Sequence, residues 1–497
     1  MRIRARTLSV LWLLAAVPVA AQDVVPPSLS LEQALEIART GNPGFLQTRN
    51  DEALADWDVR QAWGQLMPSA TASGGASWQG GGEQQIGSLT LEDLGLGSQP
   101  SYYFSNYSLD LSYSLSWGTI LGPRQSKADR RVTLANIDVA EGNLVSQVTN
   151  AYVEVLRQRE ALRIAELQLD NSEFNLRLAE AQLAVGSVTP IDVGLAEVQV
   201  GRAEVTVLQT RNSLATSRMR MLQLLGMSVT QDFEPSTTFE LVQPTWDLET
   251  LTRMAYTDNP DLRARRLSSE SAAVGVSSAR SAYYPSLSLR TGWSGFSREA
   301  TSTDLQIAQA QAQVAGSIAS CVQTNDLYSR LTPPLPPIDC TQLAFTDEQR
   351  DAIISANDQF PFGFEQSPPS IGLTISLPIF QGLTRQRNLE AARLQRADLI
   401  EQVREQELAL EADLAIGLAN AQTLYESALL EERNRELADQ QLRLARERYQ
   451  LGAITFVDLV AAQTDLAQAE ADRATAIFAY HDSVTTLEAL IGSSLRF

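Results

Sequence analysis

Two stretches of the chain alternate strictly between apolar and polar side chains. YSLDLSYSLSWG (107–118) places its large apolar residues on one side of an extended chain, and SIGLTISLPIF (370–380) does the same. This period of two predicts amphipathic β-strands. The residues that share the apolar faces are Tyr107, Leu109, Leu111, Tyr113, Leu115 and Trp117 in the first strand, and Ile371, Leu373, Ile375 and Leu377 in the second.

Most of the remaining chain has a helical period. Two stretches, from about 122 to 185 and from about 384 to 451, contain almost no helix-breaking residue and would span roughly 90–100 Å each. In the second stretch, apolar residues recur at three- and four-residue steps, as at Leu410, Leu414 and Leu418. That spacing is typical of a coiled-coil seam. A rigid tube and a solvated spacer without a lumen both fit the helical period.

The chain contains two copies of one design. LEQALEIARTGNP (31–43) returns as LETLTRMAYTDNP (248–260), and AVGSVTPIDVGLAEVQVGRAE (184–204) returns as QLGAITFVDLVAAQTDLAQAE (450–470). The period is far longer than that of a solenoid repeat. The sequence therefore predicts a duplicated domain.

Both copies are expected to have the same order of elements. The residue before a proline disfavours the helical conformation, which predicts helix ends before Asn42-Pro43 and Asn259-Pro260. The first copy, 22–246, is expected to have helices within 31–66, strands at 69–79 and 104–117, a long helix at 122–185, a tip turn at 186–191 and a return helix at 192–226. The second copy, 247–497, is expected to have helices within 248–283, strands at 286–296 and 370–380, an insert at 297–369, a long helix at 384–451, a tip turn at 452–457 and a return helix at 458–491.

The N-terminal residues predict an exported protein. Three arginines precede an apolar run, and Val19-Ala20-Ala21 supplies the small residues that signal peptidase requires, so residues 1–21 are expected to be a signal peptide. Without them the formal charge falls from −20 to about −23, which argues against nucleic acid as a partner. No later stretch has eighteen or more apolar residues, so entry into a membrane would require strands.

The only two cysteines, Cys321 and Cys340, lie in one proline-rich segment. In an oxidising compartment we expect a disulfide that closes a loop of about twenty residues and contributes about 3 kcal/mol. Free thiols or a metal pair are the alternatives. The surrounding insert, between the two strands of a pair, is expected to be an extracellular loop.

Four amphipathic strands cannot form a stable wall in lipid by themselves. The edge N–H and C=O groups of an open sheet have no partner in hydrocarbon, and four strands are too few to close a barrel. Three chains would supply twelve strands. The expected fold is therefore mainly α with β: a duplicated domain whose four strands contribute to a trimeric 12-strand transmembrane β-barrel, together with long coiled-coil helices.

The tip motifs, VGSVTPIDVGLAE and YQLGAITFVDLVAAQTDLAQAEADR, together with the duplication, the two strand pairs and the long helices, resemble the TolC family of outer-membrane efflux proteins over essentially the whole mature chain. The resemblance implies a homotrimer in outer-membrane lipid, with a long periplasmic domain in which the coiled-coil helices form a periplasmic α-barrel. It also implies a periplasmic adaptor protein and an inner-membrane transporter as partners. The expected function is a passive exit duct of a tripartite efflux or type I secretion system.

The resemblance also implies roles for the two tip turns. Gly186, Asp192, Tyr449, Gly452 and Asp458 match positions of the family motif, and Asp458 is expected to line the pore constriction, with Asp192 as a weaker candidate. Three copies of Asp458 around an axis would form a carboxylate ring that attracts cations. The alternative role for either aspartate is an ordinary helix cap. The adaptor is expected to dock on Gly186, Ser187, Val188, Thr189, Gly452, Ala453 and Thr455.

The chain departs from the family pattern at two tip positions. Ala461 stands where some members carry a second aspartate, and Ile454 stands where some carry an arginine that holds the entrance shut. A two-layer acidic ring and an arginine latch are therefore not expected. We expect apolar contacts of Ile454 and Phe456, with Tyr449, to close the entrance instead.

No catalytic, cofactor or metal motif is present. His481 is the only histidine, and there is no nucleophile–histidine set, phosphate-binding glycine loop or zinc spacing. The sequence therefore predicts no enzyme, no catalytic residues, no cofactor and no metal. The rival interpretation is a periplasmic coiled-coil structural or adaptor protein without its own pore, which would leave the paired amphipathic strands without a purpose.

Overall fold

The computed structural model describes residues 26–82, 85–86, 89–90 and 100–496. The expected signal peptide, 1–21, lies outside these residues. The chain divides into two compact units. The helical unit comprises residues up to Val59, Arg124–Val276 and the chain from Glu390; the strand unit comprises Arg60–Pro123 and Ser277–Leu389.

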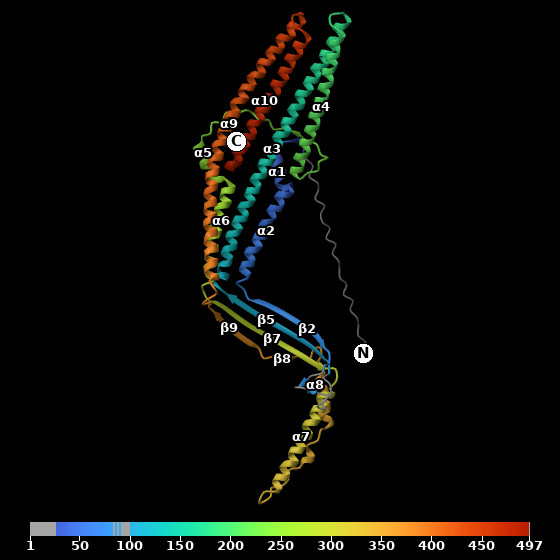
Figure 1. Ribbon diagram of the computed structural model, residues 1–497, viewed down its shortest axis with the longest axis vertical. Helices are drawn as coiled ribbons and strands as arrows, with labels where there is room; N and C mark the ends of the chain where they lie inside the picture. The colour runs from blue at the N-terminus through green and yellow to red at the C-terminus, as the bar shows by residue number, and fades with distance from the viewer. Residues whose placement is uncertain (1–25, 83–84, 87–88, 91–99, 497) are drawn as a thin grey trace. The chain divides into compact units, whose positions relative to one another are not determined.

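Each half of the chain contributes four equivalent helices, and the second half also carries the helices of its insert (Figure 1). The first half has α1 (Leu31–Gly41), α2 (Pro43–Gly64), α3 (Trp117–Ala184) and α4 (Pro190–Leu225), and the second has α5 (Leu248–Asp258), α6 (Pro260–Ser281), α9 (Thr384–Gln450) and α10 (Phe456–Ile491). A short parallel pair, β1 (Ser28–Leu29) and β6 (Glu234–Pro235), joins the start of the first half to the linker between the halves. Within the described residues, no helix is both long and apolar enough to cross a membrane.

Two separate apolar cores hold the helical unit together. The first gathers Leu29, Ala34, Tyr152, Met221 and Leu225 from α1, α3 and α4 and their neighbours. The second gathers Leu251, Leu262, Leu410, Leu414 and Leu487 from α5, α6, α9 and α10. Each half therefore buries its own core, which is the packing expected of a duplicated domain.

The repeated Asn-Pro motif builds the same joint in each half. The side-chain amide of Asn42 donates to the carbonyl of Leu224 at 2.7 Å, and Asn259 donates to Leu490 at 2.8 Å. Each asparagine also accepts from an N–H in the first turn of the next helix, at Phe45 and Leu262. One side chain thus caps a helix and attaches the end of the return helix.

Glycine is required where each return helix ends. Gly226 and Gly492 have φ of 75° and 83°, the left-handed region that favours glycine. A Cβ on Gly226 would lie 2.0 Å from the carbonyl oxygen of Gly41, and one on Gly492 would lie 2.5 Å from that of Asp258. The backbones at both joints can approach this closely only because these positions carry no side chain.

The strand unit contains an antiparallel sheet (Figure 1). β2 (Ser69–Gln79) pairs with β5 (Tyr102–Leu115), and β5 pairs with β7 (Ser286–Ala300). The other side of β7 pairs with β9 (Ser370–Ser376) and with β8 (Glu365–Gln366). A separate hairpin joins β3 (Gln85–Ile86) to β4 (Leu89–Thr90). The central β5–β7 pairing joins the strand pair of one half to that of the other.

Several element ends differ from those expected from the sequence. β5 stops at Leu115 and α3 begins at Trp117, because the Ser116 hydroxyl accepts from the Thr119 N–H as a helix cap. Trp117 therefore belongs to α3 rather than to the strand, and α3 continues through Pro123. β7 extends to Ala300, paired with Tyr102. β9 ends at Ser376, two residues before a proline that cannot donate a ladder hydrogen bond, so Leu377 follows the strand.

The insert between β7 and β9 contains α7 (Asp304–Ser329), a short 3-10 helix (Cys340–Gln342) and α8 (Asp347–Asn357). A disulfide joins Cys321 of α7 to Cys340. The side-chain amide of Asn325 pairs with both backbone groups of Ile338, and Asn357 pairs in the same way with Ala300 at the end of β7. These contacts hold the insert together and attach it to the end of β7.

We expect Asn259→Ala to lower the free energy of unfolding by about 1–3 kcal/mol, because a partly buried carbonyl and a buried helix N–H both lose their partner. Thermal unfolding of the detergent-solubilised protein measures the change. Asn212→Ala, on an exposed turn of α4, is the matched control and should leave the midpoint unchanged. Equal shifts in the two variants would contradict the role assigned to Asn259.

Candidate functional site: helix tips and the two-faced sheet

The first tip turn joins α3 to α4. Gly186 has φ of 79°, and the N–H groups of Gly186 and Ser187 donate to the carbonyls of Leu183 and Gln182, both at 2.9 Å. Thr189 then caps α4, and Pro190 occupies the first helical position, where its fixed φ suits a helix. The turn is therefore held by its own backbone hydrogen bonds.

The second tip turn repeats this construction between α9 and α10. Gly452 has φ of 69°, and Ala453 N–H donates to the carbonyl of Arg448 at 2.8 Å. Thr455 caps α10, with its hydroxyl accepting from the Asp458 N–H at 3.3 Å. Ser187, Ala453 and Thr455 are exposed, and Val188 and Ile454 are half-buried.

The two aspartates expected at the constriction both complete helix caps. The Asp192 carboxylate accepts from the N–H and the hydroxyl of Thr189, both at 2.8 Å, and Asp458 accepts from those of Thr455 at 2.9 and 2.7 Å. These hydrogen bonds lower the pKa of both carboxyl groups, led by the N–H of Thr189 for Asp192 and by the hydroxyl of Thr455 for Asp458. Both tips therefore carry an ionised carboxylate held in a fixed orientation.

A small cluster joins the two tips. Phe456 is buried against Ala179 of α3 and Ala196 of α4, with the Tyr449 ring beside it at 6.2 Å. The Tyr449 hydroxyl donates to Gln182 Oε1 at 2.8 Å, and burial raises the pKa of this phenol, which keeps it protonated as a donor. Phe456 thus packs inside the chain, and Tyr449 links α9 to α3. Gln182 has no motif that could have identified it.

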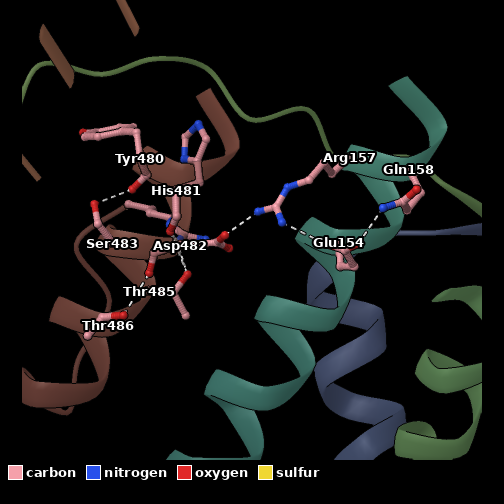
Figure 2. Close-up of polar contacts among 10 residues, drawn as sticks. Glu154, Arg157, Gln158, Tyr480, His481, Asp482, Ser483, Thr485 and Thr486 are labelled. Carbon is pink, nitrogen blue, oxygen red and sulfur yellow. Dashed lines mark hydrogen bonds and ion pairs between the residues drawn. The ribbon is translucent and has the colours of Figure 1, made fainter. Parts of the chain in front are cut away.

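Polar pairs follow α3 along its contact with α10. The buried side-chain amides of Asn175 and Gln463 exchange hydrogen bonds of 2.5 and 3.2 Å. Further along, Arg157 reaches across to Asp482 at 2.5 Å while its other nitrogen binds Glu154 at 2.8 Å, as Figure 2 shows. The two halves therefore meet at α3 and α10 through specific polar pairs, none of which the sequence pattern indicated.

The sheet has one apolar and one polar face. Three apolar residues of β5 are in register, across β7, with three apolar residues of β9. The pairs are Leu111 with Ile371, Tyr113 with Leu373, and Leu115 with Ile375. Because side chains alternate along a strand, the expected lipid-facing residues of β5 and β9 share one face. On the other face, hydroxyl pairs of 2.8 Å join Ser69 to Ser112 and Ser73 to Ser108.

No group of three or more histidine, cysteine, aspartate or glutamate side chains able to hold a metal ion occurs within the described part of the chain. The one histidine, His481, is buried beside the ring of Phe239, which in turn lies under the Arg496 guanidinium. It thus belongs to the junction of α10, the linker and the C-terminal residues.

Paired helical hairpins and an antiparallel sheet with opposite faces define the outer-membrane channel fold. The structure has a TM-score of 0.68 to the Campylobacter jejuni CmeC outer membrane channel, at 14% identity, covering 93% of this chain and 85% of that one. Residues 34–227 and 350–493 match the outer membrane efflux protein family, and the chain belongs to that family. The resemblance seen in the sequence is confirmed, and the protein is an outer membrane protein.

Curated relatives include the "Probable outer membrane lipoprotein SilC" of Salmonella typhimurium, 26% identical over 51% of this chain and 52% of that protein. The pyoverdine export outer membrane protein OpmQ of Pseudomonas putida is 27% identical over 53% of this chain and 56% of that protein. The chain spans about half the length of these relatives. The family and the similar structures are channels rather than enzymes, and they do not support the adaptor alternative.

We expect His481 to make folding stability fall as the pH drops from 6.5 to 4. Burial, followed by the nearby Arg496, lowers the pKa of His481 from 6.5 to about 4, so in this window the unfolded chain binds a proton that the folded chain does not. Thermal midpoints measured across the window should fall less steeply for His481→Gln than for the parent chain. Parallel curves would show that His481 does not contribute.

Proposed function

We propose that the chain assembles as a homotrimer and forms a passive exit duct through the outer membrane. The observation that carries this proposal is the two-faced sheet with two open edges: among the described residues β2 pairs only with β5, and β9 only with β7. Neither edge could remain unpaired in hydrocarbon. The strands run alternately, so β9 of one copy can pair antiparallel with β2 of the next, and three copies would close twelve strands.

The helices offer matching surfaces for the same neighbours. Exposed apolar side chains follow α4 at three-, four- and seven-residue steps, and others follow α9 at steps of seven. They are Ile191, Leu195, Val198, Val205 and Leu208 on α4, and Leu430, Leu437 and Leu444 on α9, with Leu451 directly after its end. These are coiled-coil seams that have no partner among the residues the structure describes. We assign them to contact between copies, which would place a helical barrel in the periplasm.

In this duct the apolar sheet face contacts outer-membrane lipid and the hydroxyl face lines a wet lumen. The tips form the periplasmic entrance, where Asp458, with Asp192, supplies a ring of carboxylates. The exposed residues of the tip turns, including Ser187 and Ala453, receive a periplasmic adaptor. That adaptor connects the duct to an inner-membrane transporter of a tripartite efflux or type I secretion system, and the transporter selects the cargo.

We expect Leu437→Asp to reduce the trimer population strongly while the helical content of the chain is retained. Leu437 is exposed in the single chain, so a carboxylate there disturbs only the seam between copies. Native mass spectrometry in detergent and circular dichroism measure the two quantities. Leu437→Met keeps an apolar side chain at the same position and is the matched control, which should leave the trimer population unchanged. A trimer that tolerates Leu437→Asp would contradict the seam.

We expect Asp458→Asn to weaken the cation preference of single channels in planar bilayers. The asparagine retains an oxygen that can accept from Thr455, so the cap survives while the ring loses its charge. Asp465→Asn, on an exposed turn of the same helix, is the control and should leave selectivity unchanged. If neither substitution changes selectivity or conductance, Asp458 acts only as a cap.

A further inference from the structure

The loop at 359–364, which precedes β8, lies against the apolar face of the sheet. The Ser105 hydroxyl of β5 donates to the carbonyl of Pro361 at 2.6 Å, and the N–H of Phe360 donates to the Glu299 carboxylate of β7 at 2.8 Å. Ser105 and Tyr107 are two residues apart on β5, so their side chains lie on the same face of the sheet. Glu299 of β7 lies opposite Tyr103. The loop therefore covers the side of the sheet that carries Leu109 and Leu111.

Two aromatic contacts fasten this loop. Phe360 packs on Tyr103 with ring centroids 5.3 Å apart, and Phe364 meets Tyr107 edge-on at 4.9 Å, a favourable geometry for aromatic pairs. The Tyr107 ring lies over Gly295 of β7, where a Cβ would be only 2.5 Å from it. The absence of a side chain at Gly295 gives the ring its place.

The loop also seals a polar interruption of the apolar face. Ser105 and Ser297 face each other there, with hydroxyl oxygens 2.7 Å apart, and both are buried, at 5% and 2% exposure. Without the loop these hydroxyls would be exposed on the same face of the sheet as Leu109 and Trp293. A buried hydroxyl pair with its own acceptor costs little, whereas an unpartnered one in lipid is expensive.

One aromatic side chain is left pointing outward. The N–H of Gly363 donates to the carbonyl of Gln359 at 2.6 Å, and a Cβ on Gly363 would lie 2.6 Å from that oxygen, so the turn is tight. At its apex Phe362 is 82% exposed, and its nearest ring, Phe364, is 6.5 Å away. This tight turn thus presents an apolar ring to its surroundings.

We propose that this loop is an anchor at the outer boundary of the membrane, with Phe362 inserted among the lipids. The proposal rests on the proposed function, which places the apolar sheet face in the bilayer. The loop continues that face up to Glu299, a charge that belongs on the water side, and α8 of the insert ends at Asn357, just before the loop begins (Figure 1). Aromatic side chains prefer this boundary. The loop thereby fixes the depth of the sheet in the bilayer.

The test uses a nitroxide attached at Phe362→Cys in the full chain, reconstituted in phosphatidylethanolamine–phosphatidylglycerol vesicles. Both native cysteines are in the disulfide, so the parent chain should take up no label. Collision of the label with oxygen, which concentrates in lipid, is compared with collision with a water-soluble nickel chelate. We expect the oxygen-to-nickel ratio at 362 to exceed several-fold that at Ile354→Cys, an exposed site on α8.

Leu373→Cys, on the exposed apolar face of β9, is the reference for lipid. A high ratio at 373 with a ratio at 362 no greater than that at 354 would overturn the anchor and leave the proposed duct intact. A low ratio at 373 as well would overturn the membrane placement of the sheet itself. A ratio at 362 that exceeds the ratio at 354 several-fold supports the anchor, and any smaller excess counts against it.

Discussion

A β-strand carries an N–H and a C=O at nearly every residue, and lipid offers no partner for either. This constraint governs the strand unit, because its sheet has β2 at one edge and β9 at the other. In the proposed duct, identical neighbours supply the missing hydrogen bonds, and the closed wall encloses a lumen lined by hydroxyl pairs such as Ser69–Ser112 and Ser73–Ser108. Trimer and channel then follow from one requirement.

The helical unit is organised around α3. Its contacts reach α4 through Ala179 and Ala196, α9 through Tyr449, and α10 through the Asn175–Gln463 and Arg157–Asp482 pairs. Each half buries its own apolar core, and α3 and α10 of different halves meet through paired polar groups as well. Such pairs fix a register, because breaking one leaves a buried polar group without a partner. In the proposed duct, the exposed apolar seams of α4 and α9 contact neighbouring copies.

The sequence carried information about local conformation and about repetition. Proline after Asn42 and Asn259 marks helix ends, and the alternation from Tyr107 to Leu115 locates a strand, because both are properties of adjacent residues. The sequence did not indicate which strands pair or which side chains contact each other in the fold. Nothing in the alternation states that β5 pairs with β7 of the other half, and Gln182 or Gln463 is an unremarkable amide until folding brings it to Tyr449 or Asn175. The helix start at Trp117 was missed because Ser116 caps the helix, and Pro123 suggested a later start.

The most direct test of the account is amide hydrogen exchange along β2 and β9 in the protein reconstituted in membranes, resolved to single residues. Half of the amides in each of these edge strands point away from β5 or β7. If neighbouring copies complete the sheet, those outward amides will exchange as slowly as the amides between β5 and β7. Outward amides that exchange as fast as an exposed turn would show that the edges are open, and the proposed wall would not exist.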